Sequence, residues 1–177
     1  MRADAVLEAD APATTWQAAL ADSLVAAGIE VAAWVPDKRL APVADALATS
    51  VPLRTLTREE ECVGYAAGFR AAGGSPVVLM QCSGLGNALN ALGSLAVPYG
   101  LGFPIVLSMR GTLGERNPAQ VELGRSAAPM LALLGIQSFS LRTPAEVAAI
   151  AQGAVALAEG ARQVAAIVLE PELELPA

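Results

Sequence analysis

The sequence contains no histidine, and this absence removes several kinds of active site at once. Histidine is the commonest general base in enzymes, and the serine and cysteine nucleophiles of catalytic triads depend on it. Most zinc sites also use histidine ligands. Any catalysis by this chain must therefore take its base from a carboxylate, a cofactor or another chain.

Positive charge is also scarce. Lys and Arg number 11 against 17 Asp and Glu, which gives a formal net charge of −6, and no run of basic residues occurs. Such a chain is a poor electrostatic partner for nucleic acid or for an anionic membrane surface. The apolar stretch 97–109 is interrupted by two prolines and two glycines, so it does not read as a membrane span. We expect a small molecule or a protein as the ligand, and neither nucleic acid nor membrane.

Cysteine is nearly absent, since only Cys62 and Cys82 occur. The first falls in a helical pattern and the second in a predicted loop, and no export signal precedes them. This distribution argues against a disulfide and predicts a cytoplasmic protein.

The chain has 177 residues, of which 54% are hydrophobic, and this suffices for one well-packed core. Apolar segments of strand character alternate with segments of helical period. This alternation predicts a doubly wound α/β domain with a parallel six-stranded sheet and helices on both faces. We expect the domain to span residues 14–170, between loose segments at 1–13 and 171–177. The expected strands are 31–35, 51–56, 76–80, 105–109, 136–140 and 164–169, and the expected helices are 16–27, 39–49, 58–73, 88–97, 127–134 and 144–159.

Ligands of such sheets bind beyond the carboxyl ends of the strands. The segments that follow Val35, Leu56, Met80 and Met109 are therefore where chemistry is expected. One of them, residues 110–126, is polar and contains glycine without a clear period, which is typical of a functional loop.

A glycine-containing segment, QCSGLGNALN, runs from Gln81 to Asn90. It is not a dinucleotide fingerprint, because Leu89 occupies the third glycine position, and it is not a Walker loop, because no Lys follows. On glycine spacing alone, the segment can also be interpreted as a tight turn near Gly84 to Asn87 that lets a helix pack closely on the sheet.

Three consecutive acids open the predicted helix at residues 58–73. Thr57 and Glu60 have the spacing of a capping box, and acids at a helix start are often solvated residues that the helix dipole favours. Glu59 precedes Cys62 at helical spacing, so its carboxyl group is expected to point inward over the strand ends. Both interpretations of Glu59 stay open on spacing alone.

Four segments together resemble the thiamine diphosphate-dependent decarboxylases, in the group that acts on sulfopyruvate and phosphonopyruvate. They are VPD at 35–37, REEECVGYAAGF from Arg58, MQCSGLGNALNAL from Met80 and MRGTLGERNPAQVELGR from Met109. The likeness extends from about Trp16 to Glu159. It implies a pyrimidine-binding (PYR) domain and a lyase that converts a 2-oxoacid to an aldehyde and carbon dioxide.

The resemblance also implies roles for single residues. Glu59 matches the glutamate that hydrogen-bonds the aminopyrimidine ring, so that the cofactor supplies the base that the chain lacks. Asp37 is implied to face the substrate and to relay protons, although a turn-forming role suits it equally. Arg110 and Lys38 are candidates for pairing with an anionic substrate tail, with structural ion pairs as the alternative. Cofactor contacts are implied for Pro36, Gln81, Ser83, Gly84 and Asn87, while Cys82 stands where relatives often have Asn.

The family holds the diphosphate and Mg²⁺ on a second domain that carries the sequence GDG, and GDG does not occur here. The resemblance therefore implies no metal ligand in this chain, a partner beta subunit with the diphosphate-binding (PP) domain, and at least two copies of each chain. Two alternatives remain. One is a split carboligase of the same family, and the other is a non-catalytic binding or regulatory subunit.

Overall fold

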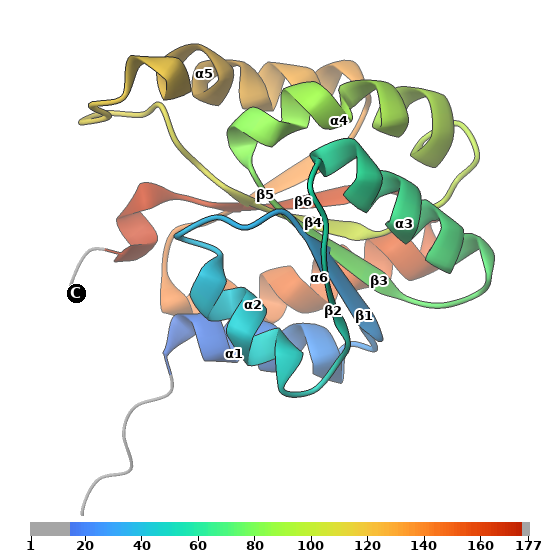
Figure 1. Cartoon of the computed structure of the whole chain (residues 1–177). Helices are drawn as coiled ribbons and strands as arrows, with labels where there is room; N and C mark the ends of the chain where they lie inside the picture. Colours follow the sequence, from blue (N-terminus) through green and yellow to red (C-terminus); the bar gives the residue numbers. More distant parts are fainter. Residues whose placement is uncertain (1–14, 175–177) are drawn as a thin grey trace, which may run out of the picture.

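The computed structural model describes residues 15–174 as one six-stranded sheet between two layers of helices (Figure 1). The strand order is β2-β1-β3-β4-β6-β5, and every neighbouring pair is parallel. The predicted fold class is confirmed. The strands are β1 (Val31–Trp34), β2 (Leu53–Thr55), β3 (Pro76–Gln81), β4 (Pro104–Ser108), β5 (Gln137–Leu141) and β6 (Ala165–Leu169).

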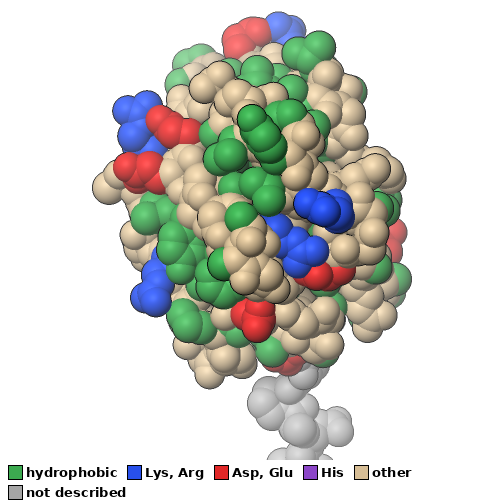
Figure 2. All heavy atoms as spheres, turned by 90° about the vertical axis from the view of Figure 1, so that its right-hand side faces the viewer, with side chains coloured by type: hydrophobic (Ala, Val, Ile, Leu, Met, Phe, Trp, Pro, Cys, Tyr) green, Lys and Arg blue, Asp and Glu red, His purple; other side chains and the backbone are tan. Residues whose placement is uncertain are grey.

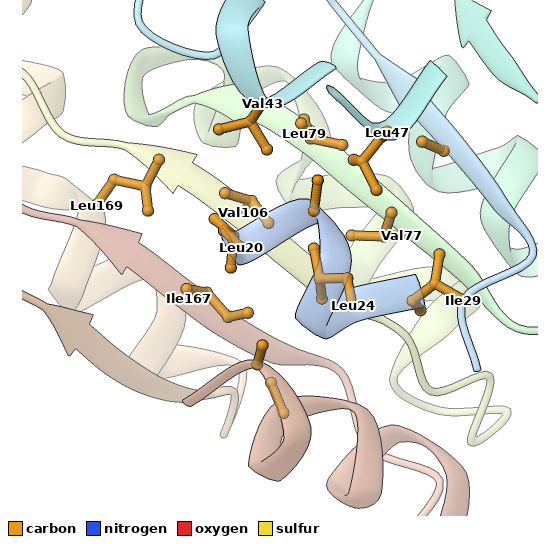
Figure 3. Close-up of a cluster of buried hydrophobic side chains, with 14 of the residues drawn as sticks. Leu20, Leu24, Ile29, Val43, Leu47, Val77, Leu79, Val106, Ile167 and Leu169 are labelled. Atoms are coloured by element: carbon orange, nitrogen blue, oxygen red, sulfur yellow. The ribbon is translucent and has the colours of Figure 1, made fainter. Parts of the chain in front are cut away.

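Alternating strand side chains bury the two faces of the sheet under different helices. Val77 and Leu79 of β3 face one layer, in which Leu20 and Leu24 are fully buried (Figure 3). The intervening β3 residues face the other layer. The first layer contains α1 (Trp16–Ala26), α2 (Ala41–Ala48) and α6 (Val147–Gly160), and the second contains α3 (Glu59–Ala71), α4 (Leu85–Ala91) and α5 (Pro118–Leu133).

Local sequence signals explain where several helices begin and end. The Thr15 side chain accepts a hydrogen bond from the amide of Ala18 at the start of α1, and Gly28 takes φ 106° just after its end. Thr143 and Glu146 form a capping box before α6, with Pro144 at the first helical position. These helix limits are therefore properties of the local sequence.

The predicted turn at residues 84–87 is wrong. A 3-10 turn, η1 (Cys82–Gly84), leads from β3 directly into α4, and a π-helical turn, η2 (Leu92–Ala96), extends α4. Gly84 has φ −67°, a helical value that needs no special turn. Its lack of a side chain has a different cause, described below.

The predicted loop at residues 110–126 is wrong in its second half. The loop ends at Asn117, whose side chain accepts a hydrogen bond from the amide of Ala119 and caps α5. Pro118 occupies the first turn of that helix, where its missing N–H is tolerated. The polar residues and Gly124 in the first turns of α5 conceal its helical period in the sequence.

In the expected loose segment 171–177, residues 171–174 form η4 (Pro171–Glu174) after β6, with Leu173 only 3% exposed, and residues 175–177 lie outside the described residues. The expected loose segment 1–13 lies outside the described residues. Within residues 15–174, none of the helices combines the length and apolar character needed to cross a bilayer.

Candidate cofactor and substrate site

The predicted site residues gather where the strand order reverses. The chain passes from β1 to β2 on one side and then returns to place β3 on the other side of β1. In an open parallel sheet such a reversal opens a crevice beyond the carboxyl ends of the two strands that flank it, which are β1 and β3 here. Pro36, Asp37 and Lys38 follow β1 here, and Ser83 follows β3.

Glu59 is the first residue of α3, and its side chain reaches the start of α4. Asn87 Nδ2 donates a hydrogen bond of 2.9 Å to Glu59 Oε2. Glu59 Oε1 has no hydrogen-bond partner among residues 15–174, and the side chain is half-buried. The structure therefore anchors one oxygen of this carboxyl group and leaves the other available.

Gly84 owes its missing side chain to this carboxyl group. A Cβ atom on Gly84 would lie 2.3 Å from Glu59 Cγ and 2.4 Å from Glu59 Oε1, distances that no real Cβ atom shows. The glycine is therefore needed for the approach of Glu59, rather than for a turn that brings helix and sheet together. Glu59, Gly84 and Asn87, which the sequence placed in two separate motifs, form one cluster.

The predicted capping box of Thr57 and Glu60 is wrong, because α3 begins one residue later than expected. Glu61 Oε2 accepts hydrogen bonds from the hydroxyl and amide of Thr57 and from the amide of Arg58. These hydrogen bonds, that from the Thr57 hydroxyl first, lower the pKa of Glu61. Glu60 instead forms an ion pair of 2.5 Å with Arg58. Glu59 is thus the acid of the three that turns toward α4.

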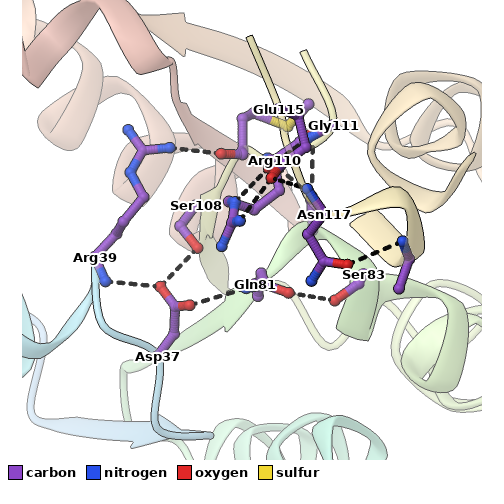
Figure 4. Close-up of polar contacts among 12 residues, drawn as sticks. Asp37, Arg39, Gln81, Ser83, Ser108, Arg110, Gly111, Glu115 and Asn117 are labelled. Atoms are coloured by element: carbon purple, nitrogen blue, oxygen red, sulfur yellow. Dashed lines mark hydrogen bonds and ion pairs between the residues drawn. The ribbon is translucent and has the colours of Figure 1, made fainter. Parts of the chain in front are cut away.

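Asp37 lies at the centre of a hydrogen-bond network at the end of β1 (Figure 4). Its Oδ1 accepts from the amides of Arg39 and Leu40, at 3.1 and 3.2 Å, as a turn-forming aspartate does. The same oxygen accepts from the hydroxyl of Ser108 at 2.9 Å, and Oδ2 accepts from Gln81 Nε2 at 3.0 Å. Asp37 therefore joins three strand ends as well as forming a turn.

The network continues toward Gly84. The Ser83 hydroxyl donates a hydrogen bond of 2.6 Å to Gln81 Oε1, so the Gln81 amide is held at both ends. Because Gly84 follows Ser83 directly, one short segment contacts Asp37 at one end and Glu59 at the other. Together with Asn87, which bonds Glu59, six of the predicted site residues are thus brought into one continuous region.

Arg110 is engaged within the chain. Its Nε and Nη2 donate to the two carboxylate oxygens of Glu115, at 2.7 and 3.0 Å. Glu115 also accepts from the amide of Asn117, at 3.0 Å. These hydrogen bonds, that from Arg110 first, lower the pKa of Glu115 to about 2 from an ordinary 4.5, and the same pairing raises the pKa of Arg110. Arg110 therefore forms a structural ion pair within the chain, which was the alternative to pairing with a substrate. Lys38 is exposed at the crevice.

Close backbone packing holds the Arg110 loop against α5. A Cβ atom on Gly124 would lie 2.0 Å from the Arg110 carbonyl oxygen, and one on Gly111 would lie 2.3 Å from the Gln120 carbonyl oxygen. Gly111 also takes φ 75°. A cavity of about 230 Å³ lies between this loop and the start of α2, and it is lined by Arg39, Met109, Arg110, Thr112, Leu113, Gly114, Glu115 and Pro171.

Cys82 has a definite polar contact in this protein. Its buried Sγ accepts a hydrogen bond from the amide of Arg110 at 3.2 Å, so the thiol joins the end of β3 to the loop after β4. Burial raises the pKa of Cys82. Both cysteines are free, as the sequence predicted, and the structure buries both of them.

Sequence reasoning missed Ser108, Arg39 and Glu115. Ser108 is fully buried, and it is a polar residue at the end of an apolar strand, a signal that the sequence does display. Arg39 Nη1 donates to the Met109 carbonyl at 2.5 Å, and this contact between segments 70 residues apart has no local signal. Within the described part of the chain, no group of three or more His, Cys, Asp or Glu side chains is placed to hold a metal ion.

Residues 14–120 match the family described as "Thiamine pyrophosphate enzyme, N-terminal TPP binding domain", and the chain belongs to this family. Among curated proteins it is similar to sulfopyruvate decarboxylase subunit alpha of Methanothermobacter thermautotrophicus, with 43% identity over 125 residues. That alignment covers 68% of this chain and 74% of the relative. It is also 32% identical over 121 residues to phosphonopyruvate decarboxylase of Streptomyces viridochromogenes, covering 67% of this chain but 30% of that longer protein.

The fold recurs in a solved structure. A 2-oxoglutarate:ferredoxin oxidoreductase from Magnetococcus marinus superposes with a TM-score of 0.69 at 15% identity, covering 88% of this chain and 28% of that chain. At this identity the likeness concerns the fold alone. The predicted family, and homology to the decarboxylases that the sequence segments indicated, are confirmed by the matches above.

Proposed function

We propose that this chain is the pyrimidine-binding alpha subunit of a thiamine diphosphate-dependent 2-oxoacid decarboxylase, and that it works with a partner subunit. The observation that carries the proposal is the Glu59 carboxyl group, anchored by Asn87 and with Oε1 available beside Gly84. When bound, thiamine diphosphate stabilises the carbanion that forms when a 2-oxoacid loses carbon dioxide. The chain's own residues fit a role in activating that cofactor.

Glu59 would hold the aminopyrimidine ring through a hydrogen bond from its available oxygen. Asn87 fixes the rotamer of the carboxyl group, because it occupies Oε2. Gly84 leaves the space in which the carboxyl group lies. A carboxylic acid at this position can exchange a proton with a ring nitrogen, so no histidine is needed.

The substrate is proposed to be sulfopyruvate, with phosphonopyruvate as the second candidate, because the alpha-subunit relative is 43% identical and the phosphonopyruvate relative is 32% identical. Both carry an anionic tail. Lys38 is exposed beside Asp37, so it suits that tail better than Arg110, which Glu115 occupies. Asp37 is proposed to hold together the strand ends that line the crevice. If Asp37 also relays protons, it would do so through Oδ2, which has one hydrogen-bond partner.

The diphosphate and Mg²⁺ are proposed to be held by the partner beta subunit. Magnesium requires several oxygen ligands, and the described residues include no acidic cluster suited to them. The relative from Methanothermobacter thermautotrophicus is named as a subunit alpha, which implies a partner subunit, so a second chain is the expected source of these ligands. An assembly of two alpha and two beta chains, or larger, follows if the site lies between chains.

The test is the Glu59→Gln variant in the complete complex. Glutamine keeps the size of the side chain and removes its acid, so turnover should fall by about 100-fold or more while the complex still assembles. Glu60→Gln is the matched control, because that acid pairs with Arg58 and should be replaced at little cost to activity. Normal turnover by Glu59→Gln would contradict the proposal.

Product analysis separates the alternatives. Release of carbon dioxide and an aldehyde from sulfopyruvate supports decarboxylation. Formation of a carbon–carbon bond only when an acceptor aldehyde is added would indicate a carboligase. A complex that binds cofactor and releases no carbon dioxide from any 2-oxoacid would indicate a binding or regulatory subunit.

A further inference from the structure

The two edges of the sheet differ in how they are protected against pairing with another strand. β2, at one edge, has only three residues, contains Arg54 and follows Pro52. β5, at the other edge, has five residues, none of them charged and none a proline, and it pairs with β6 without a bulge. Exposed edges normally carry charge, proline or a bulge, because an unprotected edge recruits other strands. β5 is therefore the edge suited to pairing.

The backbone of β5 has open hydrogen-bonding groups at Ser138 and Ser140. The Leu141 carbonyl accepts from the amide of Glu170 at 3.1 Å, so Leu141 faces β6. The N–H and C=O of one strand residue point to the same side, and successive residues alternate between the two sides. Ser138 and Ser140 therefore turn both groups away from β6, and among residues 15–174 no further strand lies beside them.

An apolar cavity lies beside this edge, between β5 and α6. Its volume is about 450 Å³, and its lining includes Phe139, Ile150, Gly153 and Leu157. Phe139 is only half-buried, although it packs against the core on this face of the sheet. Gly153 lies in the middle of α6, and a Cβ atom on it would meet nothing within 4 Å. The cavity thus leaves room for apolar atoms from outside the chain.

The surface around the cavity is uncharged. No Asp, Glu, Lys or Arg occurs between Arg125 and Arg142, or between Glu146 and Glu159. These stretches contain the whole of β5 and all of α6 before its last two residues. A short strand that pairs with its own copy brings like residues close together, so a charge on it would meet a like charge. Neutrality is what self-pairing requires, whereas a different partner could match each charge with an opposite one.

Charges of both signs flank this surface at each end of α6. Arg142 and Glu146 precede the helix, and Glu159 and Arg162 lie at its C-terminal end. Because α6 connects two parallel strands, it runs antiparallel to them and ends on the side of the molecule shown in Figure 2, where basic and acidic side chains lie next to one another near the middle of the view. Two copies in antiparallel orientation therefore bring no concentration of one charge to either end of the contact.

We propose that β5 pairs antiparallel with β5 of a second copy of this chain, across a two-fold axis that passes through Phe139. Ser138 of one copy then lies opposite Ser140 of the other, and each exchanges both of its open backbone hydrogen bonds with its partner. The two Phe139 side chains meet on the α6 side as a pair without backbone hydrogen bonds, the kind in which side chains approach most closely. Their rings occupy the space beside Gly153 of both copies.

This contact lies away from the candidate site. β4 and β6 separate β5 from the crevice beyond β1 and β3. Two copies joined at β5 therefore keep both crevices accessible to a ligand and to a partner subunit. Self-pairing at β5 stands apart from the proposed function, and neither depends on the other.

Disulfide formation in the full chain tests the two-fold axis. A non-hydrogen-bonded antiparallel pair separates its Cα atoms by about 4.5 Å, within the range of about 4.4–6.8 Å that a disulfide spans. Phe139→Cys should therefore form a disulfide-linked dimer under mild oxidation. Gln137→Cys is the matched control, because Gln137 is more exposed and lies on the same face, yet the two copies of it are roughly 13 Å apart along the paired strands. The native cysteines are buried and add no background.

The rates of oxidation of the two variants decide between pairing and collision. Dimer formation should be about tenfold or more faster in Phe139→Cys than in Gln137→Cys, because pairing holds the two thiols together. The same order of rates is expected in the complete complex with the partner subunit. Equal rates, or a faster reaction of Gln137→Cys, would overturn the proposal, since the more exposed residue wins when chains meet at random.

Proline substitution tests the open backbone groups. Ser138→Pro removes the amide that faces the edge and no hydrogen bond to β6, so the free chain should keep its fold. Self-association, measured by sedimentation equilibrium, should weaken by about tenfold or more because a backbone hydrogen bond is lost from each copy. Ser138→Ala is the control, because it keeps the amide and should associate as the wild type does. Equal association of the proline and alanine variants would contradict the pairing.

Hydrogen exchange of the wild-type chain identifies any other occupant of the edge. The amides of Ser138 and Ser140 should exchange more slowly as the protein concentration rises, because only the dimer protects them. Slow exchange at every concentration would mean that a segment of the same chain covers β5, and it would overturn the proposal. Protection that appears only when the partner subunit is added would assign the edge to that subunit, with the same result.

Discussion

Gly84 lies so close to Glu59 that one methyl group added to Gly84 would overlap the Glu59 carboxyl group. The two residues come from different helical segments, and a Cβ atom on Gly84 would be only 2.5 Å from Glu59 Cδ. The position of the acid thus depends on the absence of a side chain at another residue.

Gly84→Ala should therefore damage activity more than folding. The backbone of Gly84 is helical, with φ −67°, and accepts alanine without strain. The Glu59 side chain is flexible and would give way, which would break its hydrogen bond with Asn87. Because a displacement of about 1 Å at a reacting group can cost about 100-fold, turnover of the complex should fall by that order with little change in unfolding free energy.

The control for Gly84→Ala is Gly86→Ala. A Cβ atom on Gly86 would lie 3.7 Å from Leu123 Cδ2, an ordinary contact, so its turnover should match the wild type. Full activity of Gly84→Ala would show that the placement of Glu59 does not matter.

Ser108→Ala should destabilise the fold. Ser108 is fully buried and donates to Asp37, a charged acceptor that joins the ends of β1, β3 and β4. Removing a hydrogen bond to a charged group costs about 1–3 kcal/mol, which urea unfolding measures directly. Ser138→Ala, at an exposed position of β5, should change the unfolding free energy by less than about 0.5 kcal/mol. Equal effects of the two substitutions would contradict a special role for Ser108.

The Glu115–Arg110 pair should give the protein an acid-dependent stability. The pKa of Glu115 is about 2 in the folded chain against an ordinary 4.5, so its contribution is complete above 4.5 and is lost as the pH falls toward 2. Wild type should therefore have a higher thermal midpoint than Glu115→Gln at pH about 7, and the difference should shrink steadily below pH about 4.5. A difference that is constant down to pH about 2 would rule out this assignment.

Neither thiol should react in the folded chain. Burial raises the pKa of Cys62 to about 12, with the charges of Glu59 and Glu61 adding to the effect, and Cys82 is also buried with a raised pKa. Iodoacetamide at pH about 8 should leave the native protein unmodified and label both residues after unfolding in urea, as mass spectrometry would show. Labelling of the native chain would indicate that one helix opens readily.

The sequence predicts the sheet well because its signals are local. Caps such as Thr15 and stops such as Gly28 fix helix limits, and apolar runs of strand length fix the strands. The start of α3 shows that local signals locate a helix end only to within about one residue. A shift of one residue exchanges Glu60 for Glu61 as the capping acid, and both choices satisfy the spacing rule.

Tertiary contacts were beyond sequence reasoning at the site. Asp37 and Ser108 are 71 residues apart and meet only because the strands that precede and contain them lie close together in the sheet. The helical half of residues 110–126 was missed because Gly124, a poor helix former, is required there by the Arg110 carbonyl. In both cases contacts between distant segments determine which residue is needed, and the local sequence pattern does not reveal those contacts.

The hydrogen bonds around Gln81 also have a direction. A hydroxyl has one proton, and the Ser83 hydroxyl gives it to Gln81, so the remaining lone pairs of Ser83 can only accept. While this hydrogen bond is in place, Ser83 presents only acceptor lone pairs to the space beside it, so a ligand group that offers a proton, such as an amine, would be favoured there over a bare carboxylate or sulfonate.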